Sequence, residues 1–166
     1  GRDVAEKMEE RFAMLQREDM GLAQACVERR AALEDAAAEM NKPASPAFIV
    51  WRTSVSQDEI MQNGFDWTRV DNLSAGKARI WEWMFDNESH SFNPSRTNVR
   101  AGIDAVWVGT AADLNVRAAV YVHCKRSATR AEKLFASGTG SDASPATMAF
   151  EGDLNYLDVE VARALP

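Results

Sequence analysis

Apolar residues recur at helical spacing through the first forty residues of the chain. The positions on one face before residue 16 are Val4, Met8, Phe12 and Leu15. The segment is also rich in Ala, Glu, Arg and Met, which favour helix. The pattern slips at REDMG, where Asp19 could cap a second helix, and then resumes at Leu22, Cys26, Leu33, Ala37 and Met40. Residues 1–42 therefore predict a helical segment, either one kinked helix or two helices in series.

Two prolines in NKPASPAF end this pattern, and AFIVWRTSV follows. Its β-branched and aromatic residues predict a short strand or an extended arm over residues 46–55. Further helices are indicated by capping residues, namely Ser56, Ser74, either Ser95 or Thr97, Thr110, Thr129 and Asn155. We expect LNVRAAVYVHCK, which is apolar nearly all round, to be the central helix of the core. A short strand near Met148 and a closing helix follow, and the residues expected to turn inward from that helix are Leu157, Val161 and Leu165.

The fold class that follows is mainly α. We expect a helical bundle with a long N-terminal helical segment and one or two short strands. The breaks in pattern divide the chain into residues 1–42, the N-terminal helical segment, and residues 43–166, a helical core domain with the extended arm and a C-terminal strand and helix.

Composition narrows the classes of function. A net charge of −6 on 166 residues argues against a general nucleic-acid binder, which needs clustered Lys and Arg. Cys26 and Cys124 lie far apart without a CxxC partner, so we expect two buried free thiols and neither a metal site nor a disulfide. No apolar run approaches the ~18 residues of a membrane span, and residues 1–20 are too charged for a signal peptide. We therefore expect no membrane partner and assembly in the cytoplasm.

The glycine-rich stretch LFASGTGSDASPATMAFEG poses the question of a phosphate site. A nucleotide loop follows a strand and opens a helix, whereas here a helical pattern comes first and a strand follows, and no Lys comes after the glycines. We interpret the stretch as a surface loop with Gly138 ending the preceding helix. His123 is expected to be a satisfied core residue. No nucleophile, acid–base pair or metal set is visible, so the sequence predicts no enzyme, no cofactor and no metal.

Two features point to contacts with other molecules. Lys125, Arg126 and Arg130 gather in HCKRSATR, where they could touch phosphates or an acidic partner, although cations at a helix C-terminus are the more ordinary interpretation. Five Trp in one small domain are the second feature, because Trp is enriched where a partner covers a half-buried surface. Trp51, in the extended arm, is the best candidate. The alternative is that all five Trp fill one core.

Several segments together resemble one family. They are VWRTSV, NPSRTNVRAGI, ATRAEKLFASGTG, MAFEG and LDVEVARAL. In these segments the chain resembles small proteins encoded in the structural gene blocks of tailed bacteriophages, which carry VWRTxV, NPSRxNxRAGI, ATRAEKLFATGTG, FEG and a helix that begins with DV. The resemblance covers about residues 46–166. It implies a component of the virion or of its assembly.

Because helical structure is typical of neck adaptors, the resemblance favours a head-to-tail adaptor that docks on the portal as a ring of identical copies. Its partners would be the portal and the tail or other neck proteins, and DNA would pass through the channel without specific binding. The assembly-interface candidates are Phe48, Val50, Trp51 and Arg52 in the arm and Phe12 and Leu15 in the N-terminal helix.

Two alternatives remain open. One is a capsid decoration or scaffold-type protein, whose N-terminal helices would form a coiled coil; the apolar stripe lacks three clean heptads, which argues mildly against it. The other is a non-virion regulatory protein made during infection.

Overall fold

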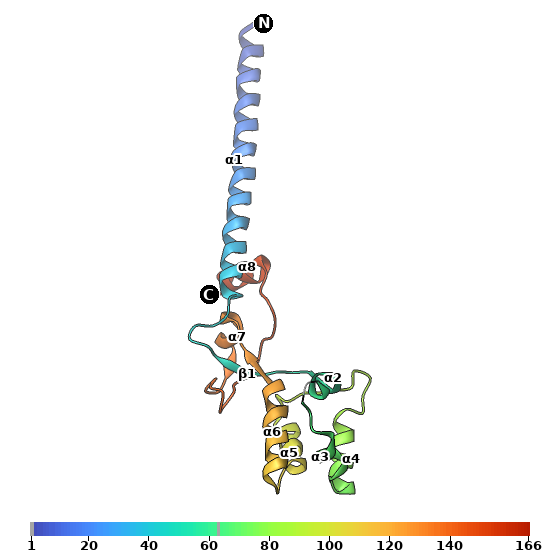
Figure 1. Cartoon of the computed structure of the whole chain (residues 1–166). Coiled ribbons are helices and arrows are strands. Elements are labelled where there is room, and N and C mark those ends of the chain that lie inside the picture. Colours follow the sequence, from blue (N-terminus) through green and yellow to red (C-terminus); the bar gives the residue numbers. More distant parts are fainter. Residues whose placement is uncertain (1, 63) are drawn as a thin grey trace. The chain divides into compact units, whose positions relative to one another are not determined.

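The computed structural model describes residues 2–62 and 64–166, and it is mainly helical, with 58% of residues in helices and 10% in strands. This confirms the expected fold class. The helices are α1 (Arg2–Met40), α2 (Gln57–Met61), α3 (Trp67–Asp71), α4 (Ala75–Met84), α5 (Thr97–Val106), α6 (Ala111–His123), α7 (Arg130–Leu134) and α8 (Tyr156–Ala164) (Figure 1). The strands are β1 (Ile49–Trp51), β2 (Val55–Ser56), β3 (Ser91–Phe92), β4 (Lys125–Ser127), β5 (Ala136–Ser137) and β6 (Thr147–Met148). They form three antiparallel pairs, β1 with β4, β2 with β3 and β5 with β6.

The chain divides into two compact units. One, called here the terminal unit, comprises Gly1–Lys42 and Asp153–Pro166; the other, called the core unit, comprises Pro43–Gly152. The sequence places a boundary after residue 42, but it assigns the closing helix to the core domain, whereas α8 groups with α1. The side-chain amide of Asn41 explains the difference, because it donates to Leu154 O at 2.8 Å and accepts from Leu154 N at 2.7 Å. Such a pairing leaves no trace in a hydrophobic pattern.

Within the terminal unit, α1 passes through REDMG without a break (Figure 1). Gly21 costs about 1 kcal/mol relative to Ala in a helix, which is too little to end one of this length. Helix α8 lies along the end of α1, with Arg29 Nη2 3.2 Å from Glu160 Oε1 and the Arg30 guanidinium over the Tyr156 ring. The expected inward orientation of the closing helix is wrong, since the side chains that are exposed are Leu157, Val161 and Leu165.

The core unit is built around an aromatic cluster. Trp81 packs edge-to-face on Trp107 with ring centroids 5.2 Å apart, and on Phe85 at 5.1 Å. The other buried members of this cluster are Val55, Ile60, Phe92, Ile103, Val106, Val116, Val120 and Cys124. Trp67 and Trp83 are exposed, so the alternative that all five Trp fill one core is wrong.

Two further expectations about burial are corrected. Helix α6 buries only one face, through Val116 and Val120, and leaves Val122 exposed, so it is not surrounded by the core. Cys124 is the buried free thiol that was expected, and burial raises its pKa to about 12. Cys26 is exposed on α1, because no other part of the terminal unit covers that turn.

Local capping signals are confirmed at five of the six predicted helix starts. The exception is α5, whose N-cap is Arg96 without a side-chain capping bond, so the prediction of Ser95 or Thr97 is wrong there. Ser56, Thr129 and Asn155 each open a helix with a complete capping box, in which side chain and backbone satisfy one another. Ser74 and Thr110 accept a bond from the amide three residues on. These short-range interactions place the starts of α2, α4, α6, α7 and α8 where the sequence predicts them.

Candidate functional site

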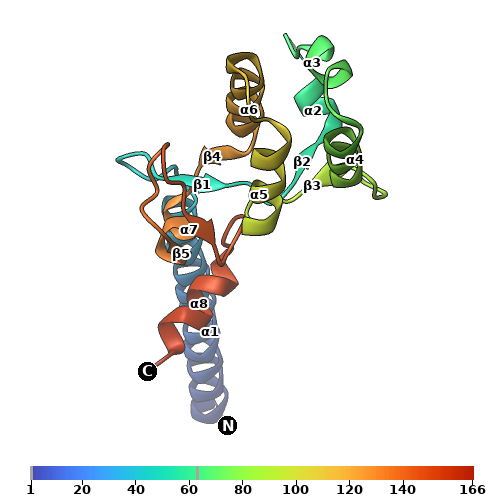
Figure 2. The same cartoon turned by 90° about the horizontal axis from the view of Figure 1, so that it is seen from below.

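The expected extended arm is an internal strand of the core unit. Strand β1 pairs with β4 in the register Ile49 with Ser127 and Trp51 with Lys125 (Figure 2). Val50 between them is fully buried against Ala128 and Ala146. The backbone is bound on the other side as well, because Ile49 N donates to Gly140 O at 2.7 Å and Trp51 N to Ala146 O at 2.9 Å. Residues 49–51 are therefore not a free arm that reaches towards neighbouring molecules.

The other arm candidates also have partners within the core unit. Phe48 is half-buried beneath the glycine loop, with Lys133 Nζ 5.5 Å from its ring centroid. Arg52 Nη2 lies 2.8 Å from Glu59 Oε1, while its Nη1 donates to His123 O at 2.9 Å. Hydrogen bonds from Ser56 and the pairing with Arg52 lower the pKa of Glu59 below its ordinary value. His123 itself is half-buried, at the end of α6.

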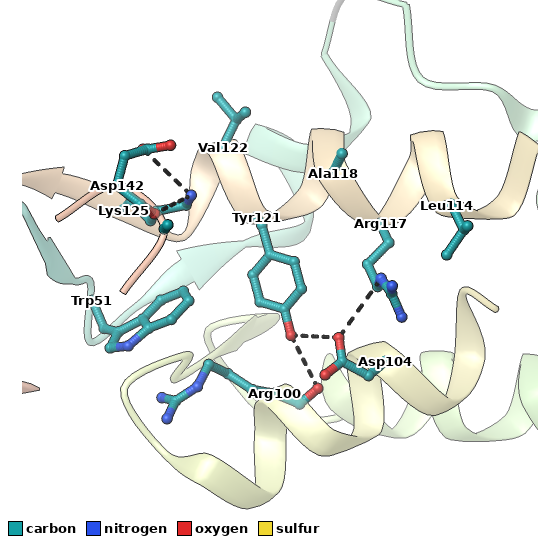
Figure 3. A pocket seen from close by; sticks show the side chains of 11 residues that line it. Trp51, Arg100, Asp104, Leu114, Arg117, Ala118, Tyr121, Val122, Lys125 and Asp142 are labelled. Atoms are coloured by element: carbon teal, nitrogen blue, oxygen red, sulfur yellow. Dashed lines mark hydrogen bonds and ion pairs between the residues drawn. The ribbon is translucent and has the colours of Figure 1, made fainter. Parts of the chain in front are cut away.

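Trp51 forms one wall of an open pocket of about 700 Å³ (Figure 3). Arg100 lies over its ring at 4.6 Å, and the Tyr121 ring packs on the same indole at 5.7 Å. Tyr121 Oη donates to Asp104 Oδ1 at 2.7 Å and to Arg100 O at 3.2 Å. The sequence does not reveal this group, because Asp104 lies in a segment with the pattern of an amphipathic helix and Tyr121 in one that is apolar nearly all round. No feature of the sequence indicates that Asp104 and Tyr121 lie beside Trp51.

The charges around this pocket are paired. Arg117 Nε lies 3.9 Å from Asp104 Oδ1, and Lys125 Nζ lies 3.4 Å from Asp142 Oδ1 (Figure 3). Burial, with the hydrogen bond to Asp104, raises the pKa of Tyr121 above its ordinary value, so this phenol stays protonated and acts as a donor. The arrangement fixes α5, α6 and β1 against one another.

Glu132 is a buried charged group of the core unit with several hydrogen-bond partners. Its side chain is buried, with 1% exposed, and accepts from Arg126 Nη1 at 2.8 Å and Nη2 at 2.6 Å. It also accepts from Thr129 N at 2.9 Å and Gly152 N at 3.1 Å. These bonds, led by those from Arg126, lower the pKa of Glu132 to about 2. One carboxylate thus joins ATRAEKL to FEG, two of the segments that carry the family resemblance.

The ion pairs change the interpretation of the HCKRSATR cluster. Arg126 is bound to Glu132, and Lys125 donates to Asp142 O at 3.0 Å. Both residues lie in β4 rather than in the last turn of α6, so the helix-terminus interpretation does not describe them. Lys125 and Arg126 therefore pair with acidic residues of the core unit itself.

Acid is expected to weaken the core unit through Glu132. The pKa in the folded state, about 2, lies below the ordinary value of 4.5, so the carboxylate contributes stability that is complete above the ordinary pKa and is lost as pH falls towards 2. The shift corresponds to roughly 3 kcal/mol. Urea titrations of the unaltered protein and of Glu132→Gln at pH 6, 4 and 2.5 measure it. The gap in unfolding free energy between the two should narrow as pH falls, and a constant gap would contradict the assignment.

The glycine-rich stretch is the turn of the β5–β6 hairpin. Gly138 and Gly140 have φ of +125° and +73°, a backbone region that L side chains rarely adopt. A Cβ on Gly140 would collide with the ring of Phe48. The glycines therefore serve the backbone turn and its close approach to Phe48. The prediction that Gly138 ends the preceding helix is wrong, because α7 ends at Leu134 and strand β5 (Ala136–Ser137) lies between that helix and Gly138.

Gly140→Ala is expected to destabilise the core unit by about 1–3 kcal/mol, since it combines positive φ with a steric clash. Gly76→Ala is the matched control, because Gly76 lies in α4 with open space around its Cβ position and should be neutral or slightly stabilising. Urea unfolding of both variants, followed by tryptophan fluorescence, measures the difference. Equal stabilities would show that the approach to Phe48 does not constrain the loop.

The two candidates on α1 lie on an exposed apolar row. The exposed fractions of the Phe12 and Leu15 side chains are 63% and 49%. Met8 and Leu22 continue the row and are exposed as well, because α8 lies only along the C-terminal end of α1. The structure thus brings Phe12 and Leu15 together on one surface of the terminal unit, whereas Val50 belongs to the core unit.

A second exposed apolar surface lies between α4 and α5 in the core unit. It is a shallow groove of about 380 Å³, lined in its apolar part by Ile80, Trp83, Met84, Val99 and Gly102. Trp83 is 73% exposed. The spacing in the sequence separates Ile80, Trp83 and Met84 from the face of Trp81, and this is the signal by which a second apolar surface could have been found.

Comparison of the chain with protein-family models, curated proteins and solved structures finds no match in any of the three. In residues 2–62 and 64–166, no three His, Cys, Asp or Glu side chains are grouped so that they could hold a metal ion. Among the helices of the same residues, none is long and apolar enough to cross a membrane.

Proposed function

We propose that this protein is a structural component of a tailed-bacteriophage virion, and that it acts as a head-to-tail (neck) adaptor. In this proposal several copies form a ring that docks on the portal and receives the tail or other neck proteins. The sequence segments between residues 46 and 166 support the phage assignment. The exposed apolar row on α1 supports an assembly role, and this observation carries the proposal.

The apolar row on α1, formed by Met8, Phe12, Leu15 and Leu22, is exposed in the single chain. Burying one Phe or Leu side chain contributes about 1.5–3 kcal/mol, so four exposed apolar side chains on one helix face represent a considerable unsatisfied interaction. Contiguous exposed apolar surface of this kind is typical of protein interfaces. Since α8 packs at the level of Arg29 to Asn41, it does not reach Phe12 or Leu15. Other chains are the natural means of covering them.

The proposal involves no reaction. The protein would act by binding and by shape, and a net charge of −6 would suit a channel along which DNA slides without adhering. That part of the proposal requires the acidic side chains to face the bore of the ring. A ring with a basic bore would contradict it.

A capsid decoration or scaffold-type protein is the second candidate. The continuity of α1 through REDMG supports this second candidate, because an unbroken helix keeps its apolar positions in one register, as a coiled coil requires. The two candidates differ in copy number, since an adaptor forms a single ring at the neck, whereas a decoration protein covers the whole capsid.

Quantification of the protein in purified particles tests the proposal. Mass spectrometry against the major capsid protein, with electron microscopy of the particles, should give about a dozen copies located at the neck. Hundreds of copies would instead indicate a decoration protein, and presence only in immature heads a scaffold. Absence from all particle forms would overturn the virion assignment and favour the non-virion regulator.

A further inference from the structure

The unbroken course of α1 brings its residues into one heptad frame. If Ala5 is position a, the a positions are Ala5, Phe12, Asp19, Cys26, Leu33 and Met40, and the d positions are Met8, Leu15, Leu22, Arg29 and Ala36. Nine of these eleven residues are apolar, and the seam is broken by one acid and one base. A repeat of 3.5 residues is the signature of helices that coil around one another. The seam is therefore longer than the sequence pattern suggested when a break at REDMG was allowed for.

The two charged residues of the seam, Asp19 and Arg29, favour one orientation of two identical helices over the other. In a parallel pair of identical helices in register, Asp19 would face Asp19 and Arg29 would face Arg29, which places like charges opposite each other. In an antiparallel pair, an a residue faces a d residue of the other helix. Crossing at residue 24 brings Asp19 of each copy opposite Arg29 of the other, since 19 and 29 are equally distant from 24. A shift by one heptad in either direction would set Asp19 against an apolar residue, Leu22 or Ala36, instead.

We infer that two copies of this chain associate through α1 as an antiparallel coiled coil that crosses at residue 24, with two Asp19–Arg29 pairs between the copies. Leu22 of each copy then packs on Cys26 of the other. Both residues are exposed in the single chain. Arg29 Nη2 also lies 3.2 Å from Glu160 Oε1 of its own chain, but the side chain is 71% exposed and available to a second carboxylate.

The same register accounts for the exposed row of α8. Phe12 and Leu15 of the second copy arrive at the level of Ala36 and Leu33, which is the part of α1 along which α8 lies. Leu33 is already covered. The incoming side chains therefore pack beside α8, whose exposed apolar residues are Leu157, Val161 and Leu165. The pairing thus brings the two exposed apolar rows of the terminal unit to the same level along α1. The inference rests on the same apolar row as the proposed function and assigns that row to a contact between two copies, whereas the position in the virion is tested separately by the copy number in purified particles.

A charge-reversal cycle tests the pairing. Sedimentation equilibrium of the full chain should show that Asp19→Arg and Arg29→Asp each weaken self-association by about tenfold or more, and that the double variant restores it to within about threefold of the unaltered protein. Glu160→Gln is the matched control for the pair within one chain, and it should leave self-association unchanged. Circular dichroism verifies that all variants keep their helix content. A double variant no tighter than the single ones would overturn the inference.

The distance between two spin labels tests the antiparallel orientation of the two α1 helices. In a C26S background, M8C carries a spin label at a residue that faces Met40 of the second copy. The two labels then lie 32 residues apart along the helices, about 48 Å at 1.5 Å per residue. A parallel pair would bring them within about 20 Å of each other, and that result would overturn the antiparallel arrangement. A chain that remains monomeric at all concentrations would overturn the inference as a whole.

Discussion

Phe12→Glu and Leu15→Glu, introduced together, are expected to abolish self-association while the protein remains folded. Each substitution removes an apolar side chain worth about 1.5–3 kcal/mol on burial and puts a charge at the interface, so association should weaken by more than about 100-fold. Both side chains are largely exposed in the single chain, with 63% and 49% of their surface accessible. The stability of either unit should therefore change little. Sedimentation velocity and urea unfolding measure the two quantities separately.

Ala31→Glu with Ala38→Glu is the matched control. Both residues lie on α1 at the f position of the heptad frame, opposite the seam, and both are exposed. They add the same two negative charges without touching the apolar row, and we expect self-association to persist. If the seam variant associates as tightly as this control, the apolar row is not the contact surface.

Glu132→Ala is expected to cost the core unit about 3–5 kcal/mol, because it leaves a partly buried guanidinium and two backbone amides without their acceptor. The groups that lose it are Arg126, Thr129 N and Gly152 N. Tryptophan fluorescence during urea unfolding is a selective probe, since all five Trp lie in residues 43–152.

Glu151→Ala is the control for this prediction. Glu151 also contacts Arg126, at 3.6 Å, and it accepts from Thr53 Oγ1 at 2.6 Å, but its side chain is 46% exposed. Exposed pairs contribute about 0–1 kcal/mol, so this variant should lose little. Equal losses in the two variants would show that burial of Glu132 does not set its importance.

Local chemistry determined how much of the fold could be predicted. The capping boxes at Ser56, Thr129 and Asn155 each depend on residues three apart, and all three are found as expected. Pairings over long distances in sequence were not accessible. Strand β4 is three residues long and pairs with β1 about 75 residues earlier, and no periodicity marks so short an element.

The same difference between local and long-range information applies to the residues of the candidate site. Phe12 and Leu15 belong to a stripe that the sequence displays directly, and the structure leaves that stripe exposed. Val50 and Trp51 were assigned to an arm because apolar residues beside prolines could be either free or paired. The strand partner, supplied by Lys125 to Ser127, decides between these possibilities. Similarly, the apolar spacing of Leu157 and Val161 shows that α8 has an apolar face, but not whether α1 or another molecule covers it.

The native mass of the full chain in solution tests the central claim most directly. Light scattering coupled to size exclusion, repeated over a range of concentrations, should give species heavier than one 18.4 kDa chain, and these should dissociate when Phe12 and Leu15 are replaced by Glu. A mass of 18.4 kDa at every concentration, equal to that of the seam variant, would contradict the account of α1 as an assembly surface.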